Sequence, residues 1–125
     1  MEQDELAGVI AKALKNGETE LDLRQQRLES FPPEIGNLTS LTYLDLRNNL
    51  LTALPTGMGY LANLTDLYLS NNLLAALPPG IGELTNLTWL DLSNNQLTAL
   101  TLEMAEQISK TITGRRVVNL SENPP

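Results

Sequence analysis

The chain has 125 residues, enough for one domain with a substantial core, and its apolar residues are mostly leucine. Its net charge of −7 argues against nucleic acid and anionic membranes, which need clustered Lys and Arg. It has no cysteine, which excludes disulfides and thiolate metal sites. The first residues are acidic where a signal peptide is basic, and no stretch approaches the roughly 20 apolar residues that span a bilayer. We therefore expect a soluble, cytoplasmic protein.

The first expected element is an amphipathic helix over residues 4–15. Asn16 and Gly17 supply its C-terminal cap. We expect it to cover the open end of the core that follows. A membrane-surface helix is the alternative, but only Lys12 and Lys15 are basic. The apolar residues at helical spacing are Leu6, Val9, Ile10, Ala13 and Leu14.

From about residue 19 to residue 101 the sequence repeats every 23 residues. The spacing Leu-x-Leu predicts short strands with both leucines on one face. One repeat cannot bury these leucines alone, so successive strands must stack in parallel while the rest of each repeat returns the chain on the other side. This predicts an α/β solenoid of four repeats. Its strand leucines are Leu21, Leu44, Leu67 and Leu90, followed two positions later by Leu23, Leu46, Leu69 and Leu92.

An amide residue recurs where each strand is expected to end. An asparagine side chain offers two donors and an acceptor, enough to satisfy backbone groups that a turn leaves unpaired. We therefore predict a structural role for Asn49, Asn72, Asn95 and, in the last strand, Asn123. The first repeat has Gln26 instead, which predicts a less tightly bonded first turn.

The end of the chain is expected to close the array. A longer helix is predicted to end near Gly114, and the segment VVNLSENPP then repeats the strand pattern through Val118, Leu120 and Asn123. The fourth repeat would therefore have 28 residues in place of 23. The helix is indicated by Met104, Ala105, Ile108 and Ile112.

The repeats follow the pattern LxxLxLxxNxLxxLP in three stretches, LTYLDLRNNLLTALP, LTDLYLSNNLLAALP and LTWLDLSNNQLTAL. In this the chain resembles the leucine-rich repeat family, in its short-repeat class found in Ras-group plant and animal proteins and in many bacterial proteins. The resemblance implies a curved, right-handed solenoid with a parallel sheet on its concave side. We expect one domain, with an N-terminal cap helix in residues 1–18, four repeats in 19–101, and a C-terminal cap helix and last strand in 102–125.

The sequence offers no set of converging catalytic groups, since it has no His and no Cys. Asp22, Asp45 and Asp91 recur at one repeat position, which we interpret as a feature of the repeat. A single column of acids cannot wrap a calcium ion, which prefers six to eight oxygen ligands. No phosphate-binding glycine loop is present. We predict no enzymatic activity, no metal and no cofactor.

Strand residues that alternate with the core leucines are expected to face the open, concave side of the sheet. Three of the five aromatic residues fall there, a composition typical of interaction surfaces. The alternative is ordinary cross-strand pairing between good strand formers. The candidate partner-binding residues are Asp22, Arg24, Tyr43, Asp45, Arg47, Asp66, Tyr68, Trp89 and Asp91.

We interpret the chain as an interaction module that binds a protein or peptide on its concave face and is itself a monomer. Asp45, Asp66 and Asp91 surround Trp89 and favour a partner of basic character, with a cation near the indole. One alternative is a scaffold or regulatory segment of a larger signalling protein, similar to the arrays of Roco-type and other GTPase-linked proteins. Another is a repeat array without a dedicated partner.

Overall fold

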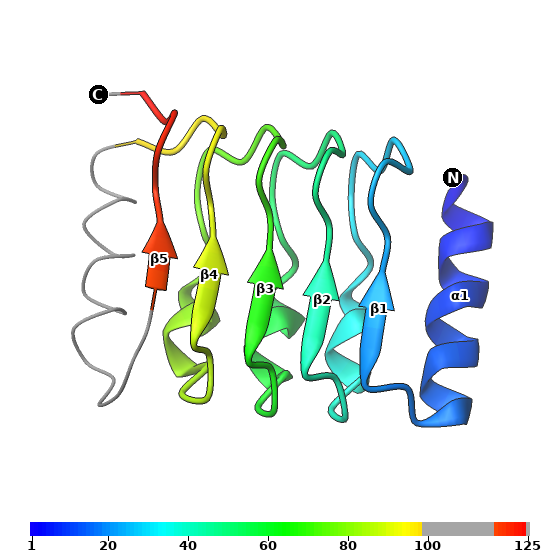
Figure 1. The fold of residues 1–125 in the computed structure, drawn as a ribbon. Coiled ribbons are helices and arrows are strands. Elements are labelled where there is room, and N and C mark those ends of the chain that lie inside the picture. The colour runs from blue at the N-terminus through cyan, green and yellow to red at the C-terminus, as the bar shows by residue number, and fades with distance from the viewer. Residues whose placement is uncertain (99–116, 125) are drawn as a thin grey trace.

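A right-handed solenoid follows a single N-terminal helix, as seen in a computed structural model that describes residues 1–98 and 117–124 (Figure 1). Five parallel strands form one sheet in chain order. Short 3₁₀ helices return the chain behind the sheet (Figure 1). The elements are α1 (Gln3–Asn16), β1 (Glu20–Asp22), η1 (Pro33–Asn37), β2 (Tyr43–Asp45), η2 (Thr56–Tyr60), β3 (Asp66–Tyr68), η3 (Pro79–Glu83), β4 (Trp89–Asp91) and β5 (Val117–Asn119).

The strand register confirms the repeat that the sequence predicts. Leu44 pairs with Leu21 on one side and with Leu67 on the other, so equivalent residues lie side by side. Trp89 pairs with Val117, which confirms the longer fourth repeat. Both leucine columns of strands β1 to β4 are buried in one continuous core, together with the apolar residues of the return segments. The helix expected before Gly114 lies outside the described residues.

Helix α1 covers the open end of the first repeat, as predicted. Leu6, Ile10 and Ala13 are buried in the common core. Gly17 adopts the left-handed conformation at φ 59°, where glycine has no side chain to clash, and ends the helix. The prediction was wrong for Leu14, whose side chain is 51% exposed. The helix presents a face narrower than the spacing suggested, so Leu14 points past the edge of the core.

The asparagine column forms a continuous ladder of hydrogen bonds, confirming the structural role predicted for it. Asn72 is buried, and its Nδ2 donates to the carbonyl oxygens of Leu46 at 3.0 Å and Leu69 at 3.1 Å. Its Oδ1 accepts from the backbone N–H of Leu51 at 3.1 Å. Each amide thus joins the end of its own strand to the turn before it. The same pattern is made by Asn49, Asn95 and Asn123.

Gln26 differs from the ladder for a physical reason. Asn49 bonds backward, to the carbonyl oxygen of Leu23 and the N–H groups of Gln26 and Leu28. The first turn is therefore held by the second repeat, and Gln26 has no preceding turn to hold. Its Nε2 donates instead to the carbonyl oxygen of Arg24 at 3.1 Å. The first turn therefore keeps the bonds from the following repeat but lacks the one that each later amide makes to the end of its own strand, in line with the expectation from Gln26.

A threonine column forms a second ladder at the start of the strands. Thr65 donates its hydroxyl to the carbonyl oxygen of Thr42 at 2.9 Å, and Thr88 donates to that of Thr65 at 3.1 Å. The backbone N–H groups of the same two threonines donate to the same oxygens. Strands β1 to β4 are thus fixed to their neighbours at both ends, which leaves the residues between them in a fixed register.

The 3₁₀ helices behind the sheet contact one another through glycine. A Cβ added to Gly57 would lie 2.7 Å from the carbonyl oxygen of Pro33, and one added to Gly36 would lie 2.7 Å from the carbonyl oxygen of Gly57. Such a separation is too short for any side-chain atom, so these positions require glycine. The backbones of η1 and η2 therefore touch directly.

Replacing Asn72 by alanine should destabilise the fold. The change leaves buried carbonyl and N–H groups unpaired, so Asn72→Ala should lower the free energy of unfolding by about 1–3 kcal/mol. Asn86→Ala is the matched control, because Asn86 is exposed and makes one bond, to the carbonyl oxygen of Ala62. Urea unfolding followed by circular dichroism measures both, and equal midpoints for the two variants would contradict the ladder.

Gly57→Ala should destabilise the fold as well, by about 1–3 kcal/mol, because the added methyl group overlaps backbone atoms that cannot move independently. Gly8→Ala is its control. Gly8 lies within α1 with nothing within 4 Å of an added Cβ, so the change should stabilise by about 0.5–1 kcal/mol. Thermal unfolding of both variants checks the opposite signs, and a stabilised Gly57→Ala would show that the 3₁₀ helices are not in contact.

Candidate partner-binding face

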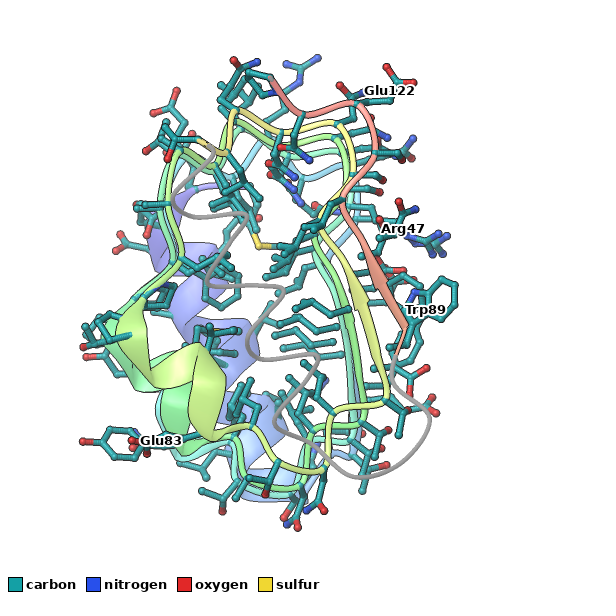
Figure 2. The ribbon with its side chains drawn as sticks, turned by 90° about the vertical axis from the view of Figure 1, so that its left-hand side faces the viewer. Arg47, Glu83, Trp89 and Glu122 are labelled. Atoms are coloured by element: carbon teal, nitrogen blue, oxygen red, sulfur yellow. The ribbon has the colours of Figure 1, made fainter. Side chains whose placement is uncertain are left out.

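The concave face is the side of the sheet turned away from the core. Its first column pairs Tyr43 with Asp66 and Asp66 with Trp89, and its second pairs Asp45 with Tyr68. Figure 2 shows Arg47 and Trp89 projecting from this side, while Glu83 lies at the opposite side of the molecule. The structure therefore places the candidate residues on one side of the sheet, although not all of them are exposed there.

Three rings form an aromatic cluster on this face, made of Tyr43, Tyr68 and Trp89. The centroids of Tyr43 and Tyr68 lie 5.4 Å apart with the rings inclined at 50°. Those of Tyr68 and Trp89 lie 6.4 Å apart at 39°. Such tilted pairs contribute about 0.5–1.5 kcal/mol each beyond their buried area. All three residues are half-buried, so each keeps part of its surface exposed.

Arg47 extends the aromatic cluster at one end. Its guanidinium carbon lies 4.6 Å from the centroid of the Tyr68 ring, within the range of a cation–π contact. The same guanidinium donates to both carboxylate oxygens of Asp45, at 3.0 Å and 2.6 Å. Two bonds from a planar group leave little freedom to rotate. The cation is thus held against the ring before any partner arrives.

Asp45 is not available to a partner, and this part of the expected site is wrong. Its side chain has no exposed area, because larger neighbours cover it. It accepts a hydrogen bond from the Tyr43 hydroxyl at 3.2 Å, and Arg24 approaches it at 3.5 Å. Burial, and then the negative charge of Asp45, raise the pKa of Tyr43 above its ordinary value. Asp45 orients the residues around it.

The remaining acids of this column have a structural role that the sequence analysis missed. Asp22 accepts the backbone N–H of Arg24, and Asp91 accepts that of Ser93, both at 3.1 Å. Asn119 does the same for Ser121. The recurring spacing of two between an Asp or Asn and a polar residue was the available signal. Tyr68 occupies this position in β3, so the aromatic cluster interrupts the column.

Charge is divided across the concave face. Arg24 and Arg47 lie at the β1–β2 end, with side chains 50% and 33% exposed. The Arg24 guanidinium holds the pKa of Asp22 below its ordinary value. Asp66 lies beside Trp89 on β3 and Asp91 lies two residues along β4, and neither has a cationic partner within ion-pair distance in the described part of the chain. Both arginines are thus paired with aspartates, whereas Asp66 and Asp91 have no cation beside them in the described residues.

Trp89 is less exposed than the alternation of the strand suggested. It lies on the concave face and beside Asp66 and Tyr68, as predicted, but it is half-buried. Its indole Nε1 is buried and has no hydrogen-bond partner among residues 1–98 and 117–124. An unpaired buried donor costs about 1–3 kcal/mol. The indole is therefore held by its neighbouring rings and not by a hydrogen bond.

Other kinds of site find little support in the described residues. In that part of the chain no three His, Cys, Asp or Glu side chains gather closely enough to hold a metal ion. No helix in it is long and apolar enough to cross a membrane. An apolar groove between α1 and η1 is lined by Ala7, Ala11, Leu14 and Pro32, among others, on a different side from the aromatic cluster.

Comparison with known structures shows the same fold in three leucine-rich repeat proteins. A leucine-rich repeat protein of Leptospira interrogans is 33% identical with a TM-score of 0.75, over 82% of this chain and 25% of the other. The ectodomain of the receptor kinase SOBIR1 of Arabidopsis thaliana is 26% identical with a TM-score of 0.69, over 89% and 60%. The leucine-rich repeat domain of APL1B is 24% identical with a TM-score of 0.71, over 98% and 37%, and shows the fold alone.

The chain thus spans less than two thirds of each of these proteins. Curated protein sequences gave no match. A family model described as a leucine-rich repeat region matches residues 20–119, which include all five strands. Domains of this fold are generally protein-binding scaffolds without catalytic activity. With its 23-residue period, its parallel sheet and its asparagine ladder, the chain belongs to the leucine-rich repeat family.

Proposed function

We propose that the chain binds a partner protein or peptide on its concave face, through the aromatic cluster and Arg47. The observation that carries this proposal is the gathering of Tyr43, Tyr68 and Trp89 on one open surface. Aromatic residues and arginine are the side chains that most often dominate binding energy at protein interfaces. Here they lie on strands, where the backbone loses little freedom on binding.

The size of the sheet limits the kind of contact. Five strands spaced about 4.8 Å apart span only some 20 Å. A standard interface buries about 800 Å² on each partner, more than this face offers without its rims. We therefore propose a contact with a short peptide or an extended loop, of modest affinity, in place of a large, tight complex.

Asp45 supports this function indirectly by preparing the surface. Its buried carboxylate fixes Arg47, approaches Arg24 and accepts from the Tyr43 hydroxyl. Side chains fixed in advance lose less entropy when a partner binds. We propose that Asp45 acts as a positioning residue for the face, in place of the direct contact first expected.

Three further expectations stay predictions. They are a cytoplasmic location, a monomeric state, and the alternative that the array is a scaffold or regulatory segment of a larger signalling protein. The last of these requires further domains, whereas binding through the aromatic cluster does not. Binding by the isolated 125-residue chain would support the proposal independently of any such domain.

Removing a ring of the aromatic cluster should weaken partner binding. Trp89→Ala and Tyr68→Ala should each lower the affinity at least tenfold, as truncation of a central aromatic contact does. Tyr60→Ala is the matched control, since Tyr60 is 72% exposed at the end of η2, behind the sheet. Quantitative affinity capture from a lysate of the source organism compares the three variants with the original chain. If Tyr60→Ala reduced capture of the partner as much as Trp89→Ala and Tyr68→Ala do, the binding site would not be the concave face.

Asp45→Asn should loosen the face and cost stability. The change keeps the side-chain volume but removes the charge that holds Arg47, so we expect a loss of about 1–3 kcal/mol, below the usual range for a buried pair because Arg47 is partly exposed. Asp22→Asn is the control, since its pair with Arg24 is half exposed and should contribute about 0–1 kcal/mol. Urea midpoints give both values. Equal midpoints for Asp45→Asn and Asp22→Asn would mean that the buried ion pair of Asp45 stabilises the fold no more than the exposed pair of Asp22.

A further inference from the structure

The sheet has an open edge at β1, the strand nearest α1 (Figure 1). We infer that this edge binds an extended segment of a partner protein as an added strand, with an apolar residue beside Leu21 and a basic residue beside Glu20. The edge is separated from Trp89 on β4 by about 14 Å at the usual strand spacing. The inference therefore goes beyond the proposed function and does not depend on the aromatic cluster.

The backbone of Glu20 and Asp22 has no strand to pair with on its outer side. Tyr43 and Asp45 are their equivalents in β2, and these two direct their backbone groups toward β1. There the Tyr43 N–H donates at 3.2 Å and the Asp45 carbonyl oxygen accepts at 2.8 Å. The same groups of Glu20 and Asp22 point away from the sheet, and no backbone bond to them comes from the described residues. A row of unpaired N–H and C=O groups is a template for a further strand.

The open stretch of this edge ends at Arg24, whose backbone groups are bonded within the chain itself. The Arg24 N–H donates to the Asp22 carboxylate at 3.1 Å. The Arg24 carbonyl oxygen accepts from the Gln26 side chain, also at 3.1 Å. The amide of Gln26, which stands outside the asparagine ladder, thus closes the edge on this side. The edge therefore offers a partner only the length of β1, which is three residues.

A cleft between β1 and α1 leaves room for the added strand. Helix α1 packs chiefly against η1, behind the sheet. Leu21 is 9% exposed, whereas its equivalents Leu44, Leu67 and Leu90 have no exposed area. The core is therefore not fully covered at this edge, and an apolar side chain beside Leu21 would complete the cover. The cleft has a volume of about 370 Å³ and is lined by Val9, Lys12, Ala13, Glu18, Glu20 and Leu21.

The charge around the cleft favours a base beside Glu20. Side chains alternate along a strand, so the neighbours of the apolar residue would lie on the concave side, beside Glu20 and Asp22. Asp22 is already paired with Arg24 at 2.8 Å. Glu18 and Glu20 are exposed and have no cation within ion-pair distance in the described part of the chain. Lys12 offsets only one of these two acids among the lining residues, which leaves the cleft net negative.

A second copy of the chain does not suit this edge. Two β1 strands paired about a twofold axis at Leu21 would place Glu20 of each copy opposite Asp22 of the other. Like charges directly opposite one another destabilise strand pairing. Charged residues on edge strands are a common protection against self-association. The acids that oppose a second copy thus favour a basic strand.

The test follows the backbone N–H signals of Glu20 and Asp22 by NMR in the ¹⁵N-labelled chain. The probe is acetyl-Thr-Lys-Val-Lys-Thr-amide, whose symmetric order suits either strand direction. We expect the probe to shift both signals and to slow their hydrogen exchange, while the indole N–H signal of Trp89 stays unchanged. Comparison peptides replace both Lys by Glu, replace Val by Ser, or carry methyl groups on the three central backbone nitrogens. Each should bind at least about threefold more weakly than the probe at low salt.

A variant of the chain tests the charge of the edge with little change of shape. Glu20→Gln should weaken the probe about threefold and leave the peptide with two Glu no weaker than before. Glu83→Gln is the matched control, because Glu83 is equally exposed but lies in η3, behind the sheet. It should leave the affinity of the probe unchanged.

Three results would overturn the inference. The first is a probe that leaves the Glu20 and Asp22 signals unmoved or binds no better than its comparison peptides. The second is a shift of the Trp89 indole in place of these signals, which would assign the basic peptide to the aromatic cluster. The third is a shift of the Glu20 signal with protein concentration alone, which would make a second copy the occupant. Loss of the natural partner with Trp89→Ala tests the proposed function separately, so either proposal can fail while the other stands.

Discussion

The rest of the structure depends on the backward hydrogen bonds of one buried amide in each repeat. Asn72 joins Leu46 and Leu51 of the preceding turn to Leu69 of its own strand. Buried backbone groups must be paired somewhere, and a chain that turns after a strand of three residues cannot pair them within the turn. The amide satisfies them and in doing so fixes the offset between successive strands. The leucine core supplies most of the hydrophobic stabilisation, but the amides set the register in which leucines of successive repeats pack.

That fixed offset is also what builds the candidate site. Residues far apart in the chain become neighbours because they occupy related positions in successive repeats. The aromatic cluster arises where the sequence departs from its own repeat, since Tyr68 stands in a column otherwise held by Asp or Asn. A perfectly regular array would present the same side chains along its whole surface, whereas one different residue in a column creates a distinct patch at that point. The regular positions therefore specify the fold, and the irregular positions distinguish this protein from others of its family.

Much of this could be predicted from the sequence, because a period of 23 residues imposes the strands, their order and the columns of the concave face. The cap helix and the longer last repeat follow from the same pattern. Burial within the concave face could not be predicted, because it depends on side-chain lengths in adjacent columns. Asp45 disappears beneath Arg47 and Tyr43, while Asp22, with the same backbone position, stays half exposed. Leu14 shows the same limit at the edge of the core, where spacing alone does not say how wide the covered face is.

The direction of the asparagine bonds has a consequence for how the chain is made. Asn49 holds the turn formed by Gln26 and Leu28, which the ribosome releases earlier, and Asn123 holds Leu97 in the same sense. The turn of each repeat is completed by the asparagine of the repeat that is synthesised next, so the array can assemble in the same direction as synthesis. Each newly emerged repeat closes the one already outside the ribosome, beginning from α1. A duplicated 23-residue unit would enter such an array without changing the bonding of its neighbours, which gives the gene a simple route to a wider concave face.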